Sequence, residues 1–344
     1  MLIGISGKNL KLSLEELKLL KAKNIWVDGF WIKFDAQSQL IFELWGFVKI
    51  AELVDLHSLK IKTKLLGSND PKLVKKLKQE GKITRYKIIE PQHVDLEIKN
   101  KGIEILQTPF GYAQVVFYQP IEIYQTIDFD KPLRGMEVGM MPAKLTHIMV
   151  NIARAELPNP QDFTIYDPFV GFGTTAMITN WLGGKFIGSD INITMAKQNI
   201  KRWQSQPFFK DKPITLFKHD VTKPFTKKFL QNVDAVVSEW WLGPSLRWKR
   251  LDYQFVESLA TKVGDVYKWF LSNWYQLVNS HQSNLKTMVI SLPYWSKYDI
   301  SLVDRLLPEL KFLKWQKIDR YLRSKQRVGR ELVKIHFEKQ SWSN

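Results

Sequence analysis

The stretch from residue 163 to residue 192 constrains the fold of this chain more than any other. It opens with Phe163-Thr-Ile-Tyr166, a short run of β-branched and aromatic residues that predicts a buried strand. Gly171 and Gly173 follow, and glycines allow a tight turn and a close approach of the backbone to a ligand. An apolar helical segment then stops at Gly183-Gly184, and a second strand follows. The stretch therefore predicts a strand–turn–helix–strand unit of an α/β domain.

An acidic residue closes each of these two strands. Asp167 ends the first strand and Asp190 ends the second, 23 positions later. In nucleotide-binding units a carboxylate about 20 residues after the turn holds a ribose hydroxyl. The spacing therefore indicates a nucleoside ligand.

The turn differs from that of a nicotinamide dinucleotide site. Such a site uses Gly-x-Gly-x-x-Gly to seat a pyrophosphate on the helix N-terminus. Here an acid comes first and no third glycine is in register, which disfavours phosphate and suits a cationic ligand such as S-adenosylmethionine. The alternative is an α/β domain whose glycine turn binds nothing. The expected cofactor-binding residues are Asp167, Pro168, Phe169, Gly171, Gly173, Thr174, Thr175, Asp190, Ile191, Asp220 and Val221.

Length and composition narrow the class of protein. The chain has 344 residues, enough for about two domains. It has no cysteine, which excludes disulfides, thiolate zinc sites and cysteine nucleophiles. Its apolar runs are too short for a membrane span, and its N-terminus lacks the pattern of a signal peptide. We expect a cytoplasmic, monomeric protein with no metal and no membrane partner.

The net charge of +17 is unevenly distributed. Residues 1–130 hold 19 basic and 16 acidic side chains, whereas residues 131–344 hold 32 and 18. The electrostatic field of such a positive charge attracts polyanions, above all nucleic acid. A basic surface can alternatively increase solubility. The expected RNA-binding residues are Lys72, Lys75 and Lys76 on a lysine-rich helix and Arg323, Arg327 and Arg330 in the basic tail.

Three further strands are predicted after Asp190, over residues 214–218, 233–237 and 287–292, and residues 311–338 predict a closing hairpin. Each of the strands ends in polar or acidic residues. Because ligands of an open parallel sheet lie beyond the carboxyl ends of its strands, these residues should converge on one crevice. In this crevice Asp190 can accept hydrogen bonds from the ribose hydroxyls, and Asp220 can accept a hydrogen bond from the adenine amino group.

Residues 1–123 predict a smaller α+β region. Strands are expected over 1–6, 25–34 and 40–50, and one helix is expected to start at the capping box Ser13-Leu-Glu-Glu16. Another should start at Asp70-Pro71. Turn and charge signals make residues 124–141 a predicted linker.

Ser238-Glu239-Trp240-Trp241 follows the fourth strand, where amino-methyltransferases carry Asp/Asn/Ser-Pro-Pro-Tyr/Phe/Trp. An exocyclic amine is a poor nucleophile, so a polar side chain and a carbonyl accept its hydrogens while an aromatic ring fixes the base. We expect Ser238 and the next carbonyl to accept these hydrogens and Trp241 to stack on the base. Glu239 and Trp240 replace the two prolines, and Glu239 either supplies a carboxylate or points away. A core aromatic pair without catalytic role is the alternative.

The sequence resembles one family at several places. Residues 167–175, 188–192 and the Gly139-Met-Met-Pro-Ala-Lys-Leu145 passage look like the tRNA guanosine-N2 methyltransferases and their RNA methylase relatives in bacteria. Residues 7–17 and 46–51 resemble segments of that family's ferredoxin-like N-terminal domain. Over residues 60–123 the family usually has a THUMP domain.

The resemblance implies a fold and an activity. It implies a Rossmann-like S-adenosylmethionine methyltransferase domain over 142–344, with a mostly parallel seven-stranded sheet and a C-terminal hairpin. A ferredoxin-like, degenerate-THUMP RNA-binding domain would precede it over 1–123, and the product would be N2-methylguanosine in tRNA. Two alternatives stay open: a DNA adenine-N6 or cytosine-N4 methyltransferase, and an RNA-binding protein that keeps the cofactor but has lost catalysis.

Overall fold

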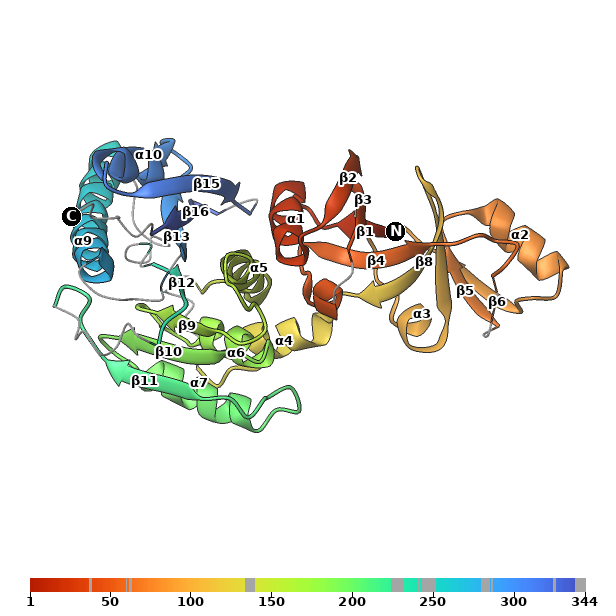
Figure 1. Ribbon diagram of the computed structural model, residues 1–344, viewed down its shortest axis with the longest axis horizontal. Coiled ribbons are helices and arrows are strands. Elements are labelled where there is room, and N and C mark those ends of the chain that lie inside the picture. The colour runs from red at the N-terminus through yellow and green to blue at the C-terminus, as the bar shows by residue number, and fades with distance from the viewer. Residues whose placement is uncertain are drawn as a thin grey trace. The chain divides into compact units, whose positions relative to one another are not determined.

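The computed structural model describes residues 1–36, 39–59, 61, 64–133, 140–223, 232–240, 242, 252–279, 285, 287–323 and 326–337. The chain divides into two compact units, Met1–Ile121 and Glu122–Asn344, each built on one sheet (Figure 1). No helix in the described ranges combines the length and apolarity that a bilayer crossing requires.

The first unit contains one eight-stranded sheet in the order β2-β3-β1-β4-β8-β7-β5-β6. All neighbours are antiparallel except β5, which runs parallel to both β6 and β7. The strands are β1 (Leu2–Ser6), β2 (Lys23–Asp28), β3 (Trp31–Asp35), β4 (Phe47–Leu53), β5 (Leu65–Ser68), β6 (Arg85–Ile88), β7 (Ile103–Thr108) and β8 (Gly111–Tyr118).

Two strand predictions in this unit were too long. The expected strand 25–34 is a hairpin of β2 and β3, because Gly29 adopts the left-handed conformation at φ 58° and reverses the chain. The expected strand 40–50 begins instead with a 3-10 helix, η2 (Gln39–Glu43), and only its second part is β4.

The predicted capping box at Ser13 is wrong. Helix α1 (Leu10–Glu16) starts earlier, with Asn9 as N-cap, and the 3-10 helix η1 (Leu17–Leu20) follows it. Glu16 is buried and accepts hydrogen bonds from the amides of Trp45 and Gly46 instead of capping its own helix. The capping-box pattern was misleading because Glu16 makes hydrogen bonds with a segment that is distant in the sequence and not with the start of its own helix. Helices α2 (Pro71–Gln79), capped by Asp70 as predicted, and α3 (Leu96–Lys101) complete the unit.

The second unit confirms the predicted fold class. Its sheet has the order β11-β10-β9-β12-β13-β16-β15. The first five strands are parallel. The terminal hairpin adds β16, which is antiparallel to β13, and then β15, which is antiparallel to β16 and so runs in the same direction as the first five. The strands are β9 (Thr164–Asp167), β10 (Lys185–Asp190), β11 (Ile214–Lys218), β12 (Ala235–Glu239), β13 (Thr287–Trp295), β14 (Ile300–Ser301, paired with β13), β15 (Lys314–Tyr321) and β16 (Val328–His336).

Helices cover both faces of this sheet (Figure 1). Helices α9 (Tyr253–Asn279) and α10 (Leu302–Leu306) pack on the face formed by Tyr166, Val236 and Met288. Helices α5 (Ala143–Arg154) and α6 (Thr174–Trp181) pack against each other and contact β9, β10, β12 and β13. The remaining helices are α4 (Ile121–Phe129), which covers part of the expected linker, α7 (Thr194–Gln204) and the 3-10 helix η3 (Leu307–Glu309).

Candidate functional site

A pocket of about 540 Å³ lies beyond the carboxyl ends of β9, β10 and β12. Its lining includes the glycine turn, the start of α6 and the acids that close the strands. Of the predicted residues, it contains Asp167, Pro168, Phe169, Gly171, Thr174, Thr175, Asp190, Ile191, Asp220, Val221, Glu239 and Trp240. Parallel strands thus bring together side chains that are more than 70 residues apart in the chain.

The glycine turn is shaped by its own backbone and by Asp190. Gly171 and Gly173 have φ angles of 48° and 82°, a region that favours glycine. Asp190 Oδ2 accepts from the Gly171 amide at 3.0 Å, and Oδ1 accepts from the Asn192 amide at 3.1 Å. Asp190 therefore joins the end of β10 to the turn after β9.

Asp167 is buried beneath the pocket. Its Oδ1 accepts from the Phe169 amide at 3.0 Å and from the Ser238 hydroxyl at 2.6 Å. Burial raises the pKa of Asp167 to about 7, and the hydrogen bonds from Ser238, Phe169 and Thr175 oppose that rise. The carboxyl group therefore titrates near neutrality, and a cation bound next to it would lower its pKa.

Ser238 does not occupy the expected place. It is fully buried, is absent from the pocket lining, and donates its hydroxyl to Asp167. The expectation that its side chain accepts hydrogens from a target amine therefore does not match its position. Side chains alternate along a strand, so the next residue, Glu239, faces the pocket instead.

Glu239 forms an ion pair with Arg330 inside the site. Arg330 lies on β16 and reaches across β13 to the end of β12, and its Nη2 also donates to the carbonyl of Met140 at 3.2 Å. Burial raises the pKa of Glu239, whereas Arg330 and Lys131 oppose that rise. The sequence left undecided whether the Glu239 carboxylate points into the site. In the structure it does, and it is paired with Arg330.

The position of Arg330 contradicts the prediction that this residue binds RNA. Its side chain is 3% exposed, so it cannot reach phosphates on the surface. Side chains alternate along β16, and this alternation points Arg330 inward. A count of the basic residues in the tail does not show which of them point inward.

Trp240 is buried but borders the pocket. Its ring lies 4.6 Å from the ring of Tyr267 and 5.0 Å from that of Phe270, centroid to centroid. Phe169 joins the same aromatic cluster. Trp240 thus forms part of the pocket wall, packed in an aromatic cluster. Trp241 lies outside the described residues.

Lys131 contacts a residue of the pocket lining, and the sequence interpretation did not single it out. Its ammonium donates to the Thr174 hydroxyl at 2.5 Å, at the first residue of α6. Burial lowers its pKa to about 8, although Asp128 and Glu239 oppose the shift. Only its position in the predicted linker just before the distinctive 139–145 passage could have drawn attention to it.

The turn between β15 and β16 lies at the same end of the sheet as the pocket, beyond the carboxyl ends of the parallel strands. Tyr294 pairs with Gly329 and Trp295 with Val328, so the hairpin turn follows the carboxyl end of β13. Arg323 and Arg327 are exposed there. In the first unit, Lys72, Lys75 and Lys76 are exposed on α2.

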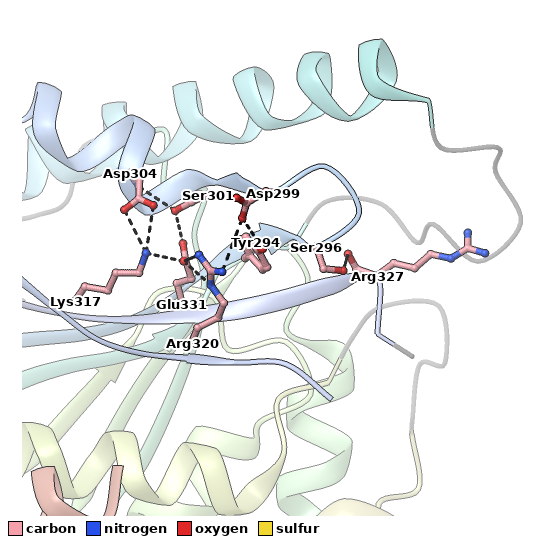
Figure 2. Close-up of polar contacts among 9 residues, drawn as sticks. All are labelled: Tyr294, Ser296, Asp299, Ser301, Asp304, Lys317, Arg320, Arg327 and Glu331. Atoms are coloured by element: carbon pink, nitrogen blue, oxygen red, sulfur yellow. Dashed lines mark hydrogen bonds and ion pairs between the residues drawn. The ribbon is translucent and has the colours of Figure 1, made fainter. Parts of the chain in front are cut away.

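A buried carboxylate anchors this hairpin. Glu331 on β16 pairs with Lys317 at 2.7 Å and with Arg320 at 2.8 Å, and it accepts from the Ser301 hydroxyl. The Arg320 guanidinium also stacks on the ring of Tyr294, 3.5 Å from its centroid. Figure 2 shows Glu331 at the centre of this cluster and the Arg327 side chain extended away from it. These contacts connect β15 and β14 to β16.

No protein-family model and no curated protein matches the sequence. Among solved structures, the N-terminal domain of human METTL16 has a TM-score of 0.39 at 11% identity, over 68% of this chain and 89% of that one. The human methyltransferase 10 domain containing protein has a TM-score of 0.39 at 12% identity, over 63% and 94%.

A magnesium protoporphyrin IX methyltransferase from Synechocystis PCC 6803 has a TM-score of 0.38 at 12% identity, over 63% of this chain and 96% of that one. These likenesses are distant, with TM-scores below 0.4. By its own strand order, the second unit has a Rossmann-like methyltransferase fold.

Proposed function

We propose that this protein is an S-adenosylmethionine-dependent RNA methyltransferase that methylates the exocyclic N2 amine of a guanosine in tRNA. One observation carries the proposal. The pocket joins a nucleoside-type site, made by the glycine turn, Asp190 and Asp220, to the Glu239-Trp240 segment after β12. A cofactor and a base could therefore meet within one cavity.

The residues present suit S-adenosylmethionine. The pocket lining contains the carboxylates of Asp167, Asp190 and Asp220. These favour a sulfonium and an ammonium and disfavour a pyrophosphate. Asp190 would hold the ribose. Asp220 Oδ1 accepts both hydrogen bonds from Thr222, which leaves Oδ2 for the adenine amine. When bound, this cofactor supplies an electrophilic methyl group.

Glu239 would act on the target amine. Its carboxylate lies in the pocket and is held by Arg330, so it can accept one N–H of the amine and orient the nitrogen. The backbone carbonyl that follows can accept the second N–H. Trp241 remains the predicted stacking residue. Orientation of this kind accounts for much of the rate of a bimolecular transfer.

Replacing Asp190 by alanine should weaken S-adenosylmethionine binding by about 10-fold or more, because a charged acceptor is lost. Isothermal titration calorimetry measures the change. Asp162→Ala is the matched control, since Asp162 is exposed and lies before β9, away from the pocket. Equal affinity in folded Asp190→Ala and wild-type protein would remove Asp190 from the site.

Reversing two charges at the hairpin turn should weaken tRNA binding. Arg323 and Arg327 are exposed beside the pocket, so Arg323→Glu/Arg327→Glu should lower affinity and flatten its dependence on salt. Lys311→Glu/Lys314→Glu makes the same change of net charge at the opposite end of the hairpin. A filter-binding salt series compares them. An equal effect of both pairs would show that only the overall charge matters.

The substrate class is tested by transfer of labelled methyl groups to bulk tRNA and to duplex DNA, side by side. The proposal expects label in tRNA. Label in DNA alone would favour the adenine-N6 or cytosine-N4 alternative. Binding of cofactor and RNA without transfer to either would favour the binding-only alternative.

A further inference from the structure

Glu239 presents a carboxylate to the pocket in surroundings that are otherwise apolar. The other carboxylates of the pocket lining lie at the ends of β9, β10 and β11, on the side of the nucleoside site. Near Glu239 the lining includes Met140, which shares the Arg330 guanidinium with it, and Trp240, the next residue in the chain. Polar groups of a ligand that stay unpaired in such surroundings are costly. A base at this end of the pocket is therefore selected by how well its edge fits one carboxylate.

Arg330 occupies only part of the hydrogen-bonding capacity of this carboxylate. Its Nε donates to Glu239 Oε1, and its Nη2 donates to the carbonyl of Met140 at 3.2 Å. In the described part of the chain no group donates to Glu239 Oε2, and the side chain is 12% exposed. The two oxygens of a carboxylate together accept about four hydrogen bonds. Oε2 and the second lone pair of Oε1 therefore remain for a ligand.

The charge of Glu239 decides what kind of partner it accepts. Burial raises the pKa of Glu239, and Arg330 opposes this rise by favouring the ionised form. An ionised carboxylate only accepts hydrogen bonds, whereas a protonated one also donates. The ion pair with Arg330 thus fixes Glu239 as an acceptor at both oxygens.

Guanine is the base whose amine edge matches two adjacent acceptors. Its N1–H and one N2–H lie side by side and point in the same direction, so the two oxygens of one carboxylate can accept both. Adenine and cytosine carry a ring nitrogen with a lone pair next to the amine. That lone pair repels a carboxylate oxygen, so the same contact that suits guanine rejects the other two bases.

We propose that Glu239 selects guanine, because it accepts a hydrogen bond from N1–H as well as from the target N2 amine. The inference rests on the proposed function, because it assumes that the target base enters beside the end of β12. It adds to the amine contact a second contact, which reads the identity of the base. A site that hydrogen-bonds a particular group rejects an analogue without that group more strongly than a site that reads size alone.

Two analogues of guanosine test the contact to N1–H. Once the methylated guanosine is located, its tRNA is assembled from synthetic pieces with one analogue at that position. 2-Aminopurine keeps the 2-amino group, but its N1 carries a lone pair instead of a hydrogen. 6-Thioguanosine keeps both hydrogens and changes only the 6 position, so it is the matched control.

Wild-type protein should methylate guanosine about 10- to 100-fold faster than 2-aminopurine in a single turnover, as expected for the loss of a charge-assisted hydrogen bond. The rate with 6-thioguanosine should lie within about 3-fold of the rate with guanosine, because no hydrogen bond to Glu239 is lost.

Glu239→Gln should reverse the preference, so that 2-aminopurine reacts faster than guanosine. The amide oxygen still accepts from the amine, but the amide N–H donates to N1 of 2-aminopurine and collides with N1–H of guanine. Both rates belong to one variant, so its general loss of activity and stability cancels in their ratio. Glu239→Gln/Arg330→Met carries the same amide without an unpaired guanidinium, which keeps the test decisive if the single variant does not fold.

Equal rates of wild-type protein with guanosine and 2-aminopurine would overturn the inference and leave the proposed function intact. So would 6-thioguanosine that reacts as slowly as 2-aminopurine, or glutamine variants that gain nothing on 2-aminopurine relative to guanosine. Wild-type protein that transfers no methyl group to guanosine in any tRNA would overturn the proposed function and the inference together.

Discussion

Glu239→Gln should reduce methyl transfer to RNA by about 100-fold or more, while the affinity for S-adenosylmethionine changes little. The glutamine keeps the size of the side chain but loses the charge that accepts the amine hydrogen. It also leaves Arg330 buried without its carboxylate, which costs about 3–5 kcal/mol of stability. Single-turnover methylation and urea unfolding measure the two effects separately.

The double variant Glu239→Gln/Arg330→Met distinguishes a role in catalysis from a role in folding. Removing both charges should restore most of the stability, because no unpaired buried charge remains. If Glu239 contacts the amine, activity should stay low despite the recovered stability. Recovery of activity in parallel with stability would show that the pair is only structural.

Replacing Glu104 by glutamine in the first unit should destabilise that unit by about 3–5 kcal/mol. Lys49 Nζ lies 2.5 Å from Glu104 Oε1, and both side chains are fully buried between central strands. Burial lowers the pKa of Lys49 and raises that of Glu104, so each charge depends on the other. Chemical denaturation of the full chain, followed by the tryptophans, measures the loss.

Lys49→Met/Glu104→Leu is the matched control for this pair. Exchanging both charges for apolar side chains of similar size removes the desolvation cost and should recover most of the stability. A single variant as stable as wild type would show that water or another group compensates the remaining charge.

The sequence predicted those parts of the fold that depend on local patterns. The glycine turn, the acids that close β9, β10 and β11, and the strand at 214–218 follow from residues that are neighbours in the chain. The Ser13 capping box failed because Glu16 bonds with Trp45 and Gly46, about 30 residues away. Local patterns carry no information about such partners.

The site was predicted less completely than the fold, for the same reason. Ser238 faces Asp167 rather than the pocket, and Glu239 takes its place, because strand alternation decides which side chain points inward. Arg330 looked like one of many surface cations but pairs with Glu239. Lys131 lies in a segment without regular structure, and only the three-dimensional contact with Thr174 identifies it.

Nucleoside mass spectrometry of bulk tRNA, after incubation with the protein and S-adenosylmethionine, decides whether the protein methylates N2 of guanosine. New N2-methylguanosine should appear with wild-type protein and should be strongly reduced with Glu239→Gln. A methylated base other than N2-methylguanosine, or no new methylated nucleoside with folded wild-type protein that binds the cofactor, would contradict the proposed function.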